Sequence, residues 1–421
     1  MLPIFDEYKN FIYEKTGLNL ESGVYWYDNS IIKAFGTDGK LYKIYRLKIE
    51  DNLSMSYSKP KSYKVPQNVS LITWGQLIER RKNCIIGLEM QTLDTIKKYL
   101  EKYSEYEPII PISTGKDSMC VLSMVRQIKP DVKAIFNNTS LDVADTYKMV
   151  KTIENCEIMN PDKGFYQYVE SDNMIPTRFS RFCCRIFKTG VMVSKLDKNH
   201  KYLLFMGMRN DESNTRSGYG TEYKNTEWGK VSWQGILPIR QWNDVDVWLY
   251  ILYKKLPINQ KYKKGYTRVG CGIACPFYNK STWILDEYYY PVMRQRWIDI
   301  LEKDFIDNGK ACILNCSKEE YLCKCWNGGM VRDEPTEEII REFMEYKNIQ
   351  DISIAKKYFN STCQECGEKL KKDEVAISMK FHGRETTTLF CKKCFMKNYN
   401  IDKEKYNWYI KRFKEDGCCL F

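Results

Sequence analysis

Strand-like and helix-like segments alternate along the chain from Pro108 onward, and this alternation restricts the possible folds more than any other feature of the sequence. The predicted elements, in order, are the strand Ile109–Ile112, a helix over 117–128, the strand Lys133–Phe136, a helix near 143–154, the strand Tyr202–Met206 and a helix over 244–254. Strands separated by helices indicate a parallel sheet with helices on both faces. We therefore predict a doubly wound α/β fold for this part of the chain.

The chain has 421 residues, which is more than one hydrophobic core usually serves. Residues 20–75 mix short aromatic and β-branched runs with turn signals, whereas residues 76–103 have the apolar spacing of a helix. We predict four parts: a small N-terminal α+β accessory domain over 1–105, the α/β domain over 106–280, a helical, cysteine-containing extension over 281–360 and a cysteine-rich module over 361–421.

The composition is that of a folded protein, with 43% hydrophobic and 29% charged residues. No run approaches the roughly 18 apolar residues that a membrane helix needs. The first residues lack the basic and then apolar pattern of a secretory signal. We therefore expect a cytoplasmic protein that has no membrane partner.

The sequence has 17 cysteines but only two histidines, His200 and His382. In a reducing compartment, so many cysteines favour metal ligands, redox groups or buried thiols over disulfides. Two histidines are too few for acid–base or zinc chemistry that depends on several imidazoles. Any metal in this chain is therefore expected to be held mainly by sulfur.

A candidate phosphate loop, Ser113–Ser118, lies between the first predicted strand and the following helix. A tight turn there directs backbone N–H groups and the helix N-terminus toward one point, which favours anion binding. Its glycine lets the backbone approach a phosphate, its lysine adds charge, its serines add donors, and its aspartate caps the helix or helps to hold Mg²⁺: Ser113, Gly115, Lys116, Asp117 and Ser118. The Walker-loop spacing is absent, which argues against a kinase or GTPase. A capped surface turn is the alternative.

The loop resembles the SGGKDS pyrophosphate loop of the PP-loop ATP pyrophosphatases, the adenine nucleotide α-hydrolase-like group, with Thr114 in place of the second glycine. Four further segments are similar, in the same order, to motifs of one branch, the phosphoadenosine phosphosulfate (PAPS) reductase family. They are Asn138–Thr146 (NTG-x-x-x-x-ET), Arg181–Lys188 (R-x-CC-x-x-x-K), Gly207–Arg216 (G-x-R-x-x-ES-x-x-R) and Leu237–Trp248 (P-L-x-x-W-x-x-x-DVW). The resemblance covers about residues 110–280.

This resemblance implies an adenine nucleotide at the carboxyl edge of the sheet. The implied contacts are Ser113, Thr114, Gly115, Lys116, Asp117, Ser118, Arg209, Glu212 and Arg216. True PAPS reductases lack the loop lysine and end in an ECG-L/I-H segment, whereas this chain has Lys116 and ends Asp416–Phe421 without histidine. The resemblance therefore implies that ATP is attacked at its α-phosphate and releases pyrophosphate, with Lys116, Asp117 and Ser118 as catalytic residues and Mg²⁺ as a cofactor.

The first cysteine group combines the pair Cys183 and Cys184 with Cys271 and Cys275, which are followed by Pro276. Iron–sulfur members of the family, including a DndC-like branch of DNA phosphorothioation, hold a [4Fe–4S] cluster with an adjacent pair and a later CxxC. The resemblance implies the same cluster here, although the second element is CxxxC. A zinc site, a cluster with one ligand from elsewhere, and buried thiols are the alternatives.

Two further cysteine groups follow toward the C-terminus. Cys312, Cys316, Cys323 and Cys325 either bind metal, supply a missing cluster ligand or have no special role. Cys363, Cys366, Cys391 and Cys394 form two CxxC pairs separated by 24 residues, a spacing typical of structural Zn²⁺. We interpret 375–379 and 387–390 as strands of a zinc ribbon. Lys392, Lys393, Lys397 and Arg384 nearby allow nucleic-acid contact, but a metal-stapled module without a partner is equally consistent.

The formal charge of +12 fits a polyanionic partner or a moderately basic solvated surface. Residues 254–268 contain six basic residues and no acidic one, with Tyr262 and Tyr266 between them. This segment leads into Cys271. It suggests either a path for a nucleic-acid backbone or a solvated loop.

Three functions remain open from the sequence. The first is an ATP-dependent, iron–sulfur PP-loop enzyme that adenylates a target, possibly nucleic acid, and assists sulfur insertion with a sulfur-donor protein. The second is a sulfonucleotide reductase, against which the absent ECG-x-H segment argues. The third is a non-catalytic nucleic-acid-binding or regulatory protein, against which the intact loop Ser113–Ser118 argues.

Overall fold

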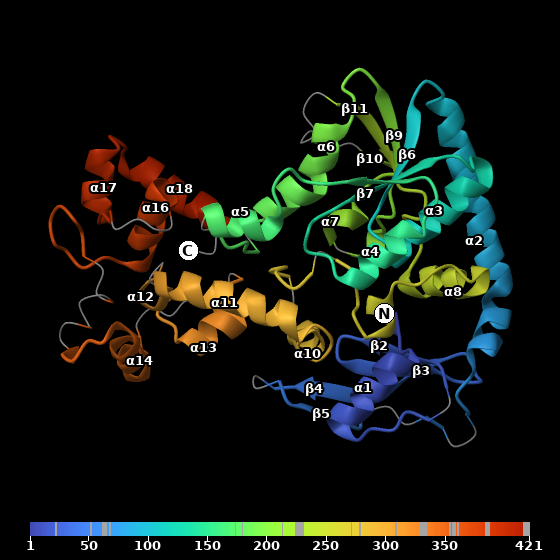
Figure 1. The fold of residues 1–421 in the computed structure, drawn as a ribbon, viewed down its shortest axis with the longest axis horizontal. Coiled ribbons are helices and arrows are strands. Elements are labelled where there is room, and N and C mark those ends of the chain that lie inside the picture. Colours follow the sequence, from blue (N-terminus) through green and yellow to red (C-terminus); the bar gives the residue numbers. More distant parts are fainter. Residues whose placement is uncertain are drawn as a thin grey trace. The chain divides into compact units, whose positions relative to one another are not determined.

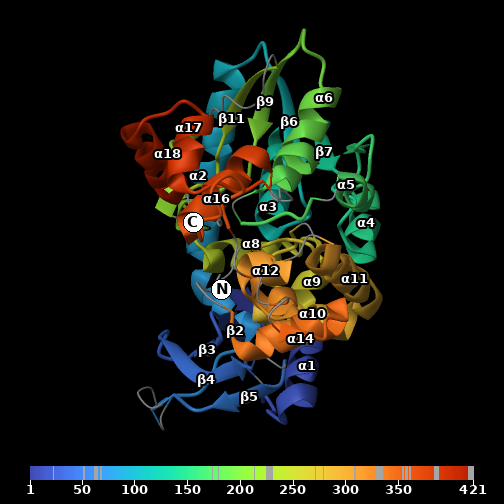
Figure 2. The same ribbon diagram turned by 90° about the vertical axis from the view of Figure 1, so that its left-hand side faces the viewer.

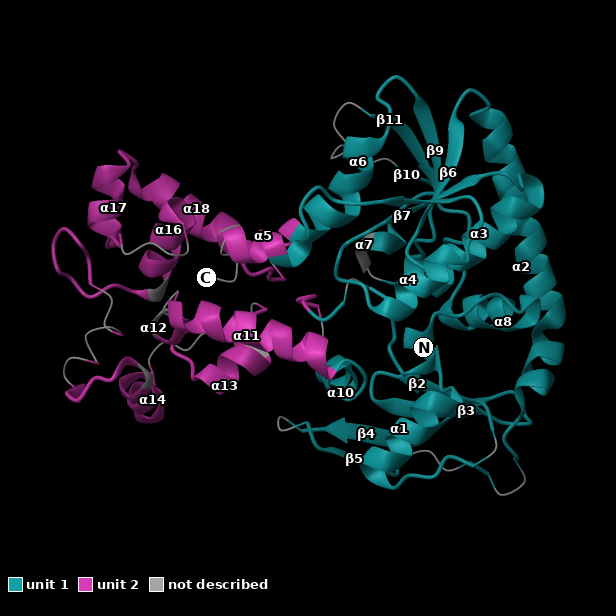
Figure 3. Cartoon of the chain, viewed as in Figure 1, with its two compact units in different colours: residues 1–166, 183–273, 278–290 teal, residues 167–182, 274–277, 291–421 magenta. Residues whose placement is uncertain are grey.

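The computed structural model describes residues 1–415 except 22, 51–52, 61–64, 67–68, 173, 179, 213, 224–230, 271, 278, 308–309, 328–334, 353–354, 356–358, 360–361 and 384–387. The chain divides into two compact units (Figure 3). The first unit comprises Met1–Tyr166, Cys183–Ile273 and Tyr278–Tyr290, and the second comprises Gln167–Phe182, Ala274–Phe277 and Pro291–Phe421. The domain boundaries at 105, 280 and 360 remain predictions from the sequence.

A six-stranded sheet with the order β10-β11-β9-β6-β7-β8 forms the centre of the first unit, and its strands from β11 to β7 lie side by side in Figure 2. The strands are β6 (Glu107–Ile112), β7 (Lys133–Asn137), β8 (Cys156–Met159), β9 (Lys201–Phe205), β10 (Glu222–Tyr223) and β11 (Ser232–Ile236). The pairs from β11 to β8 are parallel, and β10 pairs antiparallel with β11. The chain adds β7 and β8 on one side of β6 and then β9 on the other, and folds of this type bind ligands at such a reversal.

Helices cover both faces of this sheet, as the doubly wound prediction requires. Ile110 packs into one core with α2 (Trp74–Lys102), α3 (Lys116–Ile128) and α8 (Asp244–Lys254). Its neighbour Ile109 packs into a second core with α6 (Val191–Lys195). Successive strand residues point to opposite faces, so a nearly continuous apolar strand such as β6 is buried on both sides.

The remaining described helices between residues 138 and 290 belong to the first unit, except α5, most of which belongs to the second. They are α4 (Ala144–Lys151), α5 (Phe165–Asp172), the π-helix η1 (Cys184–Gly190), the 3₁₀ helix η2 (Asn210–Glu212), α7 (Asn214–Ser217), α9 (Gln260–Lys263) and α10 (Lys280–Tyr289).

A second sheet, antiparallel and five-stranded, is formed by the N-terminal segment (Figure 1). It contains β1 (Leu2–Pro3), β2 (Tyr25–Asp28), β3 (Ile31–Phe35), β4 (Leu41–Ile49) and β5 (Met55–Ser58), with α1 (Asp6–Thr16) between β1 and β2. Its buried Trp26 and Ile32 belong to the same apolar core as Ile96 of α2 and Trp248 of α8. The N-terminal sheet and the α/β region therefore share one core.

The second unit is helical. Its elements after residue 290 are α11 (Pro291–Asp307), α12 (Lys310–Leu314), α13 (Lys318–Glu320), the π-helix η4 (Tyr321–Cys325), α14 (Glu337–Lys347), α16 (Lys372–His382), α17 (Lys392–Asn398) and α18 (Lys403–Glu415). None of the described helices is long and apolar enough to cross a bilayer.

The strands predicted for a zinc ribbon are not observed in the C-terminal module. Residues 375–379 lie inside the helix α16, where the Glu374 carboxylate accepts a hydrogen bond from the Lys371 backbone N–H at 2.8 Å and closes the first turn. Thr388–Phe390 has no regular structure, and Thr387 lies outside the described residues. A short β-branched and apolar run fits either element, and here this capped first turn accompanies the helix.

Candidate nucleotide site and metal centre

The phosphate loop joins the end of β6 to the start of α3, as predicted, beside the reversal of the sheet. Thr114 has a φ of 55°, a left-handed conformation that β-branched residues rarely adopt. In the SGGKDS loop that this segment resembles, the same position is glycine, because glycine adopts a left-handed conformation without strain. The Ser118 hydroxyl donates to the Gly115 carbonyl oxygen at 2.9 Å and accepts from the Ser113 N–H at 3.3 Å, so the loop folds back on the first turn of α3.

Gly207 is the second residue after the end of β9, and it packs directly against this loop. A Cβ atom at Gly207 would lie 2.7 Å from the Asp117 carbonyl carbon and 2.9 Å from the Ser118 nitrogen. Only a residue without a side chain allows the two backbone segments to approach this closely. The glycine of the predicted G-x-R motif therefore sets the distance between the β9 loop and the phosphate loop.

We expect Gly207→Ala to destabilise the protein by roughly 1–3 kcal/mol, because the added methyl group has no space. Gly87→Ala in α2 is the matched control, since a Cβ there meets nothing within 4 Å. A helical alanine at that site is expected to stabilise by up to about 1 kcal/mol. Urea unfolding midpoints measure both changes, and equal midpoints for the Gly207→Ala and native proteins would contradict the close packing.

Two buried cations and two carboxylates lie at the N-terminus of α3. The Lys116 ammonium contacts Asp117 at 2.8 Å and Asp244 at 3.3 Å. The Arg209 guanidinium contacts the same two carboxylates at 2.6 and 2.7 Å. Asp244, the first residue of α8, also pairs with the amino group of Met1. The loop, the β9 loop and α8 are thus held together by charge-assisted hydrogen bonds.

The charge states of these groups follow from their pairing. Burial lowers the pKa of Lys116, but nearby charges, chiefly that of Asp117, outweigh burial and raise it above its ordinary value. Burial raises the pKa of Asp244, but the charge of Lys116 and other cations lower it to about 2. The pKa of Arg209 is raised by Asp117 and Asp244 against its own burial. Lys116 therefore remains an ammonium at neutral pH, as phosphate binding requires.

The other predicted nucleotide contacts connect to this cluster through Arg209. The Glu212 carboxylate accepts from the Arg209 backbone N–H at 2.9 Å and pairs with Arg216 one turn later. The structure therefore brings Arg209, Glu212 and Arg216 into one chain of polar contacts that reaches Asp117 of the loop. Their contact with a nucleotide remains a prediction.

Two residues of the α9 region, Asn259 and Tyr262, hold the loop, a role that the sequence did not indicate; Tyr262 was noted only as part of the basic segment 254–268. The Asn259 side chain donates to the Thr114 hydroxyl at 2.8 Å and to the Thr146 hydroxyl at 3.1 Å. The Tyr262 hydroxyl accepts from the Lys116 backbone N–H at 3.0 Å. Asn259 and Tyr262 are both buried. Asp244, which also contacts the loop, could have been proposed from the sequence, because it is an acidic residue at the start of the predicted helix 244–254.

The basic segment 254–268 is not an open path for nucleic acid over its whole length. Tyr262 and Tyr266 are buried and therefore cannot stack on bases. Lys261 is buried and donates to the Val269 carbonyl oxygen at 2.9 Å. Lys254 and Lys264 form ion pairs with Glu89 and Asp145. Three of the six basic side chains in this segment thus have partners inside the first unit.

Of the predicted iron–sulfur ligands, Cys183 and Cys275 are buried, and Cys184 is half-buried. Cys271 lies outside the described residues, so the four-cysteine assignment remains a prediction. Gly272 next to it has a φ of 71°, and a Cβ there would lie 2.0 Å from the Leu141 carbonyl oxygen. The segment after Cys271 therefore packs tightly onto the loop that follows β7.

Both described π-helices carry cysteines that were singled out from the sequence. η1 begins at Cys184, directly after Cys183, and η4 contains Cys323 and Cys325. π-Helices are rare and frequently lie at functional sites. In the second group Cys316 and Cys325 are buried and Cys323 is exposed, while the side chain of Cys312 lies outside the described set. Metal binding by this group remains a prediction.

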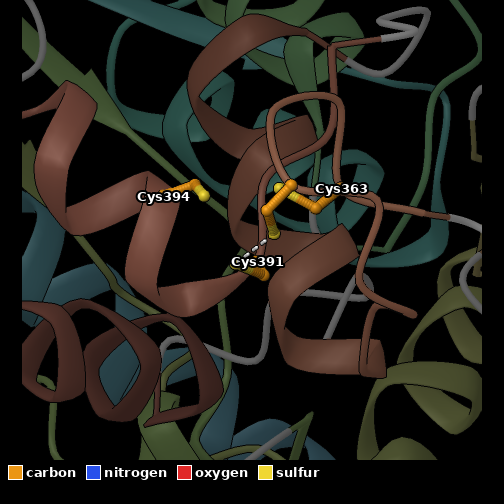
Figure 4. Close-up of side chains that lie close together, drawn as sticks. Cys363, Cys391 and Cys394 are labelled. Atoms are coloured by element: carbon orange, nitrogen blue, oxygen red, sulfur yellow. Dashed lines mark hydrogen bonds between the residues drawn. The ribbon is translucent and has the colours of Figure 1, made fainter.

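Within the described part of the chain, one set of residues has the geometry of a metal site. The sulfur atoms of Cys363, Cys366, Cys391 and Cys394 all lie within 4.8 Å of one another, and three of them are labelled in Figure 4. The sulfurs of Cys366 and Cys391 are 3.6 Å apart. Four thiolates at Zn–S distances of about 2.3 Å would be separated by about 3.8 Å, so the set fits a tetrahedral ion.

The backbone positions the two CxxC pairs differently. The first pair lies on a turn closed by Gly367, which has a φ of 73° and donates to the Cys363 carbonyl oxygen at 2.8 Å. In the second pair Cys391 is the N-cap of α17, and Cys394 lies in its first turn. Burial raises the pKa of Cys363, but backbone N–H groups outweigh it and lower the pKa to about 6. A thiolate ligand is therefore available at neutral pH.

The fold and the loop together define a doubly wound α/β domain with a candidate phosphate site at the reversal of its sheet. Residues 107–276 match the phosphoadenosine phosphosulfate reductase domain. The chain therefore contains a domain of the PAPS reductase family over these residues. The predicted doubly wound α/β fold is confirmed, and the predicted family is confirmed for these residues, whereas the DndC-like branch remains a prediction.

Relatives from other organisms match parts of this chain at low identity. An uncharacterised protein of Methanocaldococcus jannaschii is 30% identical over 233 residues, which cover 54% of this chain and 56% of that protein. The chain spans about half the length of this relative and of a second one from the same organism. An adenosine 5'-phosphosulfate reductase of Halalkalibacterium halodurans is 22% identical over 187 residues, 43% of this chain and 78% of that protein.

Among solved structures, the phosphoadenylyl-sulfate reductase from Candida auris, in complex with phosphate, is 15% identical to this chain. The match has a TM-score of 0.36 and covers 49% of this chain and 96% of that chain.

Proposed function

We propose that the chain is a PP-loop enzyme that cleaves ATP to AMP and pyrophosphate, adenylates a substrate and takes part in transferring sulfur to it. The observation that carries the proposal is the ammonium group of Lys116, which is buried in the phosphate loop at the reversal of the sheet. The helix α3 begins at Lys116, so the partial positive charge of its N-terminus adds to that of the ammonium group. Reductases of the family lack this lysine, so its presence favours a triphosphate as the ligand.

The proposed reaction needs positioning and charge neutralisation rather than imidazole catalysis. An oxygen of the acceptor attacks the α-phosphorus of ATP, the bond to the bridging oxygen breaks, and pyrophosphate leaves with the electron pair. Lys116 and the loop N–H groups stabilise the charge on the departing pyrophosphate. Mg²⁺ supplies further neutralisation when bound, and Asp117 is the proposed contact for it. Sulfide supplied by a donor protein then attacks the acceptor atom that carries the AMP group. The bond from that atom to the oxygen of AMP breaks, and AMP leaves with the electron pair.

The proposal includes two metal centres. We assign a [4Fe–4S] cluster to Cys183, Cys184, Cys271 and Cys275, and Zn²⁺ to the C-terminal set of four cysteines. The mutual sulfur distances of the C-terminal set support the second assignment. Anaerobic purification with iron, sulfide and zinc analysis tests both. We expect iron and sulfide in equal amounts together with zinc, and zinc without iron would refute the cluster.

A sulfonucleotide reductase is the second candidate, since named relatives at 22% to 27% identity are adenosine 5'-phosphosulfate reductases. The two candidates differ in product. With ATP and Mg²⁺ but no acceptor, water can take the place of the acceptor oxygen at the α-phosphorus, and the anaerobically purified protein is then expected to release pyrophosphate and AMP in equal amounts. With adenosine 5'-phosphosulfate and a thiol, it is expected to form no sulfite. Sulfite without pyrophosphate release would reverse the assignment.

A further inference from the structure

An exposed aromatic surface lies on the C-terminal module, and none of its residues is among those assigned above to the nucleotide. Trp408 of α18 is 57% exposed, and Phe381 of α16 is 37% exposed. Their rings are linked by Tyr409, whose centroid lies 5.2 Å from each of them. Trp408, Tyr409 and Phe381 therefore form one continuous patch, which we call the aromatic platform.

The platform is supported from below by the core of the module. The Phe381 ring makes an edge contact with Phe395 at 5.1 Å, and Phe395 is fully buried. Phe395 directly follows Cys394, one of the four clustered cysteines, and its N–H donates to the Cys391 carbonyl oxygen at 2.8 Å. The aromatic contacts thus run from the metal centre through the core to the surface, so the platform has a rigid base.

The charge around the platform is positive. The helix α18, Lys403–Glu415, carries five basic and two acidic residues. Lys405 and Lys411, three residues before and after Trp408, lie on the same side of the helix and are exposed. Of the two acidic residues, Glu404 lies one turn before Trp408 on the same side of the helix and is exposed. Glu415 lies 3.8 Å from Lys411, at a distance and exposure where an ion pair is weak. The net charge of α18 remains positive.

We propose that the aromatic platform binds single-stranded nucleic acid. Exposed rings offer stacking surfaces to bases of any sequence, and flanking lysines neutralise the backbone phosphates. A purely apolar protein partner would meet charged side chains on both sides of Trp408, so the charge pattern favours a polyanion with π-faces. The inference deepens the proposed function by naming the acceptor class, and it rests on the proposed function only for that role.

Binding to a labelled single strand of about 20 nucleotides, followed by fluorescence anisotropy without ATP, tests the proposal. Trp408→Ala is expected to weaken binding roughly tenfold, whereas Trp408→Phe, which keeps a stacking ring, should recover most of the affinity. Lys405→Gln is expected to reduce the slope of log affinity against log salt by about 0.7, as the loss of one phosphate contact to a single strand predicts.

Two matched controls come from the first unit. Tyr13 of α1 is also 57% exposed, and Tyr13→Ala is expected to leave affinity unchanged; Lys97→Gln on α2 serves the same purpose for charge. Equal affinity of Trp408→Ala and Tyr13→Ala would overturn the proposal. Binding of poly-glutamate with the same affinity as the oligonucleotide would also overturn the proposal, because charge alone would then account for the binding. Pyrophosphate release measured without the oligonucleotide reports separately on the phosphate loop, so failure of one does not imply failure of the other.

Discussion

Replacing Lys116 with alanine is expected to lower pyrophosphate release from ATP by roughly 10²- to 10³-fold. The lysine is the one basic side chain within the phosphate loop, and its pairing with Asp117 and Asp244 keeps it charged. Its removal takes away positive charge where negative charge develops on the leaving group. A coupled phosphate-release assay with added pyrophosphatase measures the loss.

Lys129→Ala is the matched control, since Lys129 follows the other end of α3 and is exposed. Lys116→Gln, which keeps a long side chain beside the two carboxylates, covers the case in which the alanine variant unfolds. Circular dichroism and the thermal midpoint check the fold of each variant. Activity of Lys116→Gln equal to that of Lys129→Ala, in folded protein, would remove the main support for ATP chemistry.

The second large effect is expected at the four-cysteine centre. Changing Cys391 and Cys394 to serine should abolish one zinc equivalent and unfold residues 363–415, because binding a structural zinc contributes on the order of 10–16 kcal/mol to such modules. The apolar clusters around these cysteines are small. They cannot replace that contribution. Zinc analysis and limited proteolysis of the full chain measure the two outcomes.

Cys84→Ser controls for the loss of a cysteine as such, because Cys84 is an exposed residue of α2. It should keep both the zinc content and the protease resistance of the native chain. If the Cys391→Ser, Cys394→Ser protein keeps them as well, the cysteines pack together without holding a metal. The same variant also tests the aromatic platform, whose base is the core beside Cys394.

The parts of the fold that were predicted correctly have strong local signals. β6 and β7 are short apolar runs beside turn residues, and α2 has regular apolar spacing over its whole length. β8 and β11 were not predicted, since Cys156–Met159 and Ser232–Ile236 are short and contain polar residues or glycine. Their pairing with β7 and β9 forms the strand, and pairing across a sheet leaves little trace in a short segment.

The same distinction holds for the site. The phosphate loop and the paired cysteines are motifs with fixed local spacing, so they could be found without a structure. The contacts of Asn259 and Tyr262 with the loop could not be predicted, because both residues lie more than 140 residues beyond the loop and belong to no recognised motif. The strand interpretation of 375–379 was wrong because apolar and β-branched residues occupy the inner side of a helix equally well when the first turn is capped.

The core shared by the N-terminal sheet and the α/β region has a consequence for how the protein loses its structure. Trp26, Ile96 and Trp248 come from three distant parts of the chain, yet they pack into one apolar cluster. Removing the first hundred residues would expose the apolar face on which α8 and the phosphate loop depend. We therefore expect the two sheets to unfold in a single step, and a ligand bound at the loop to protect the N-terminal sheet as well.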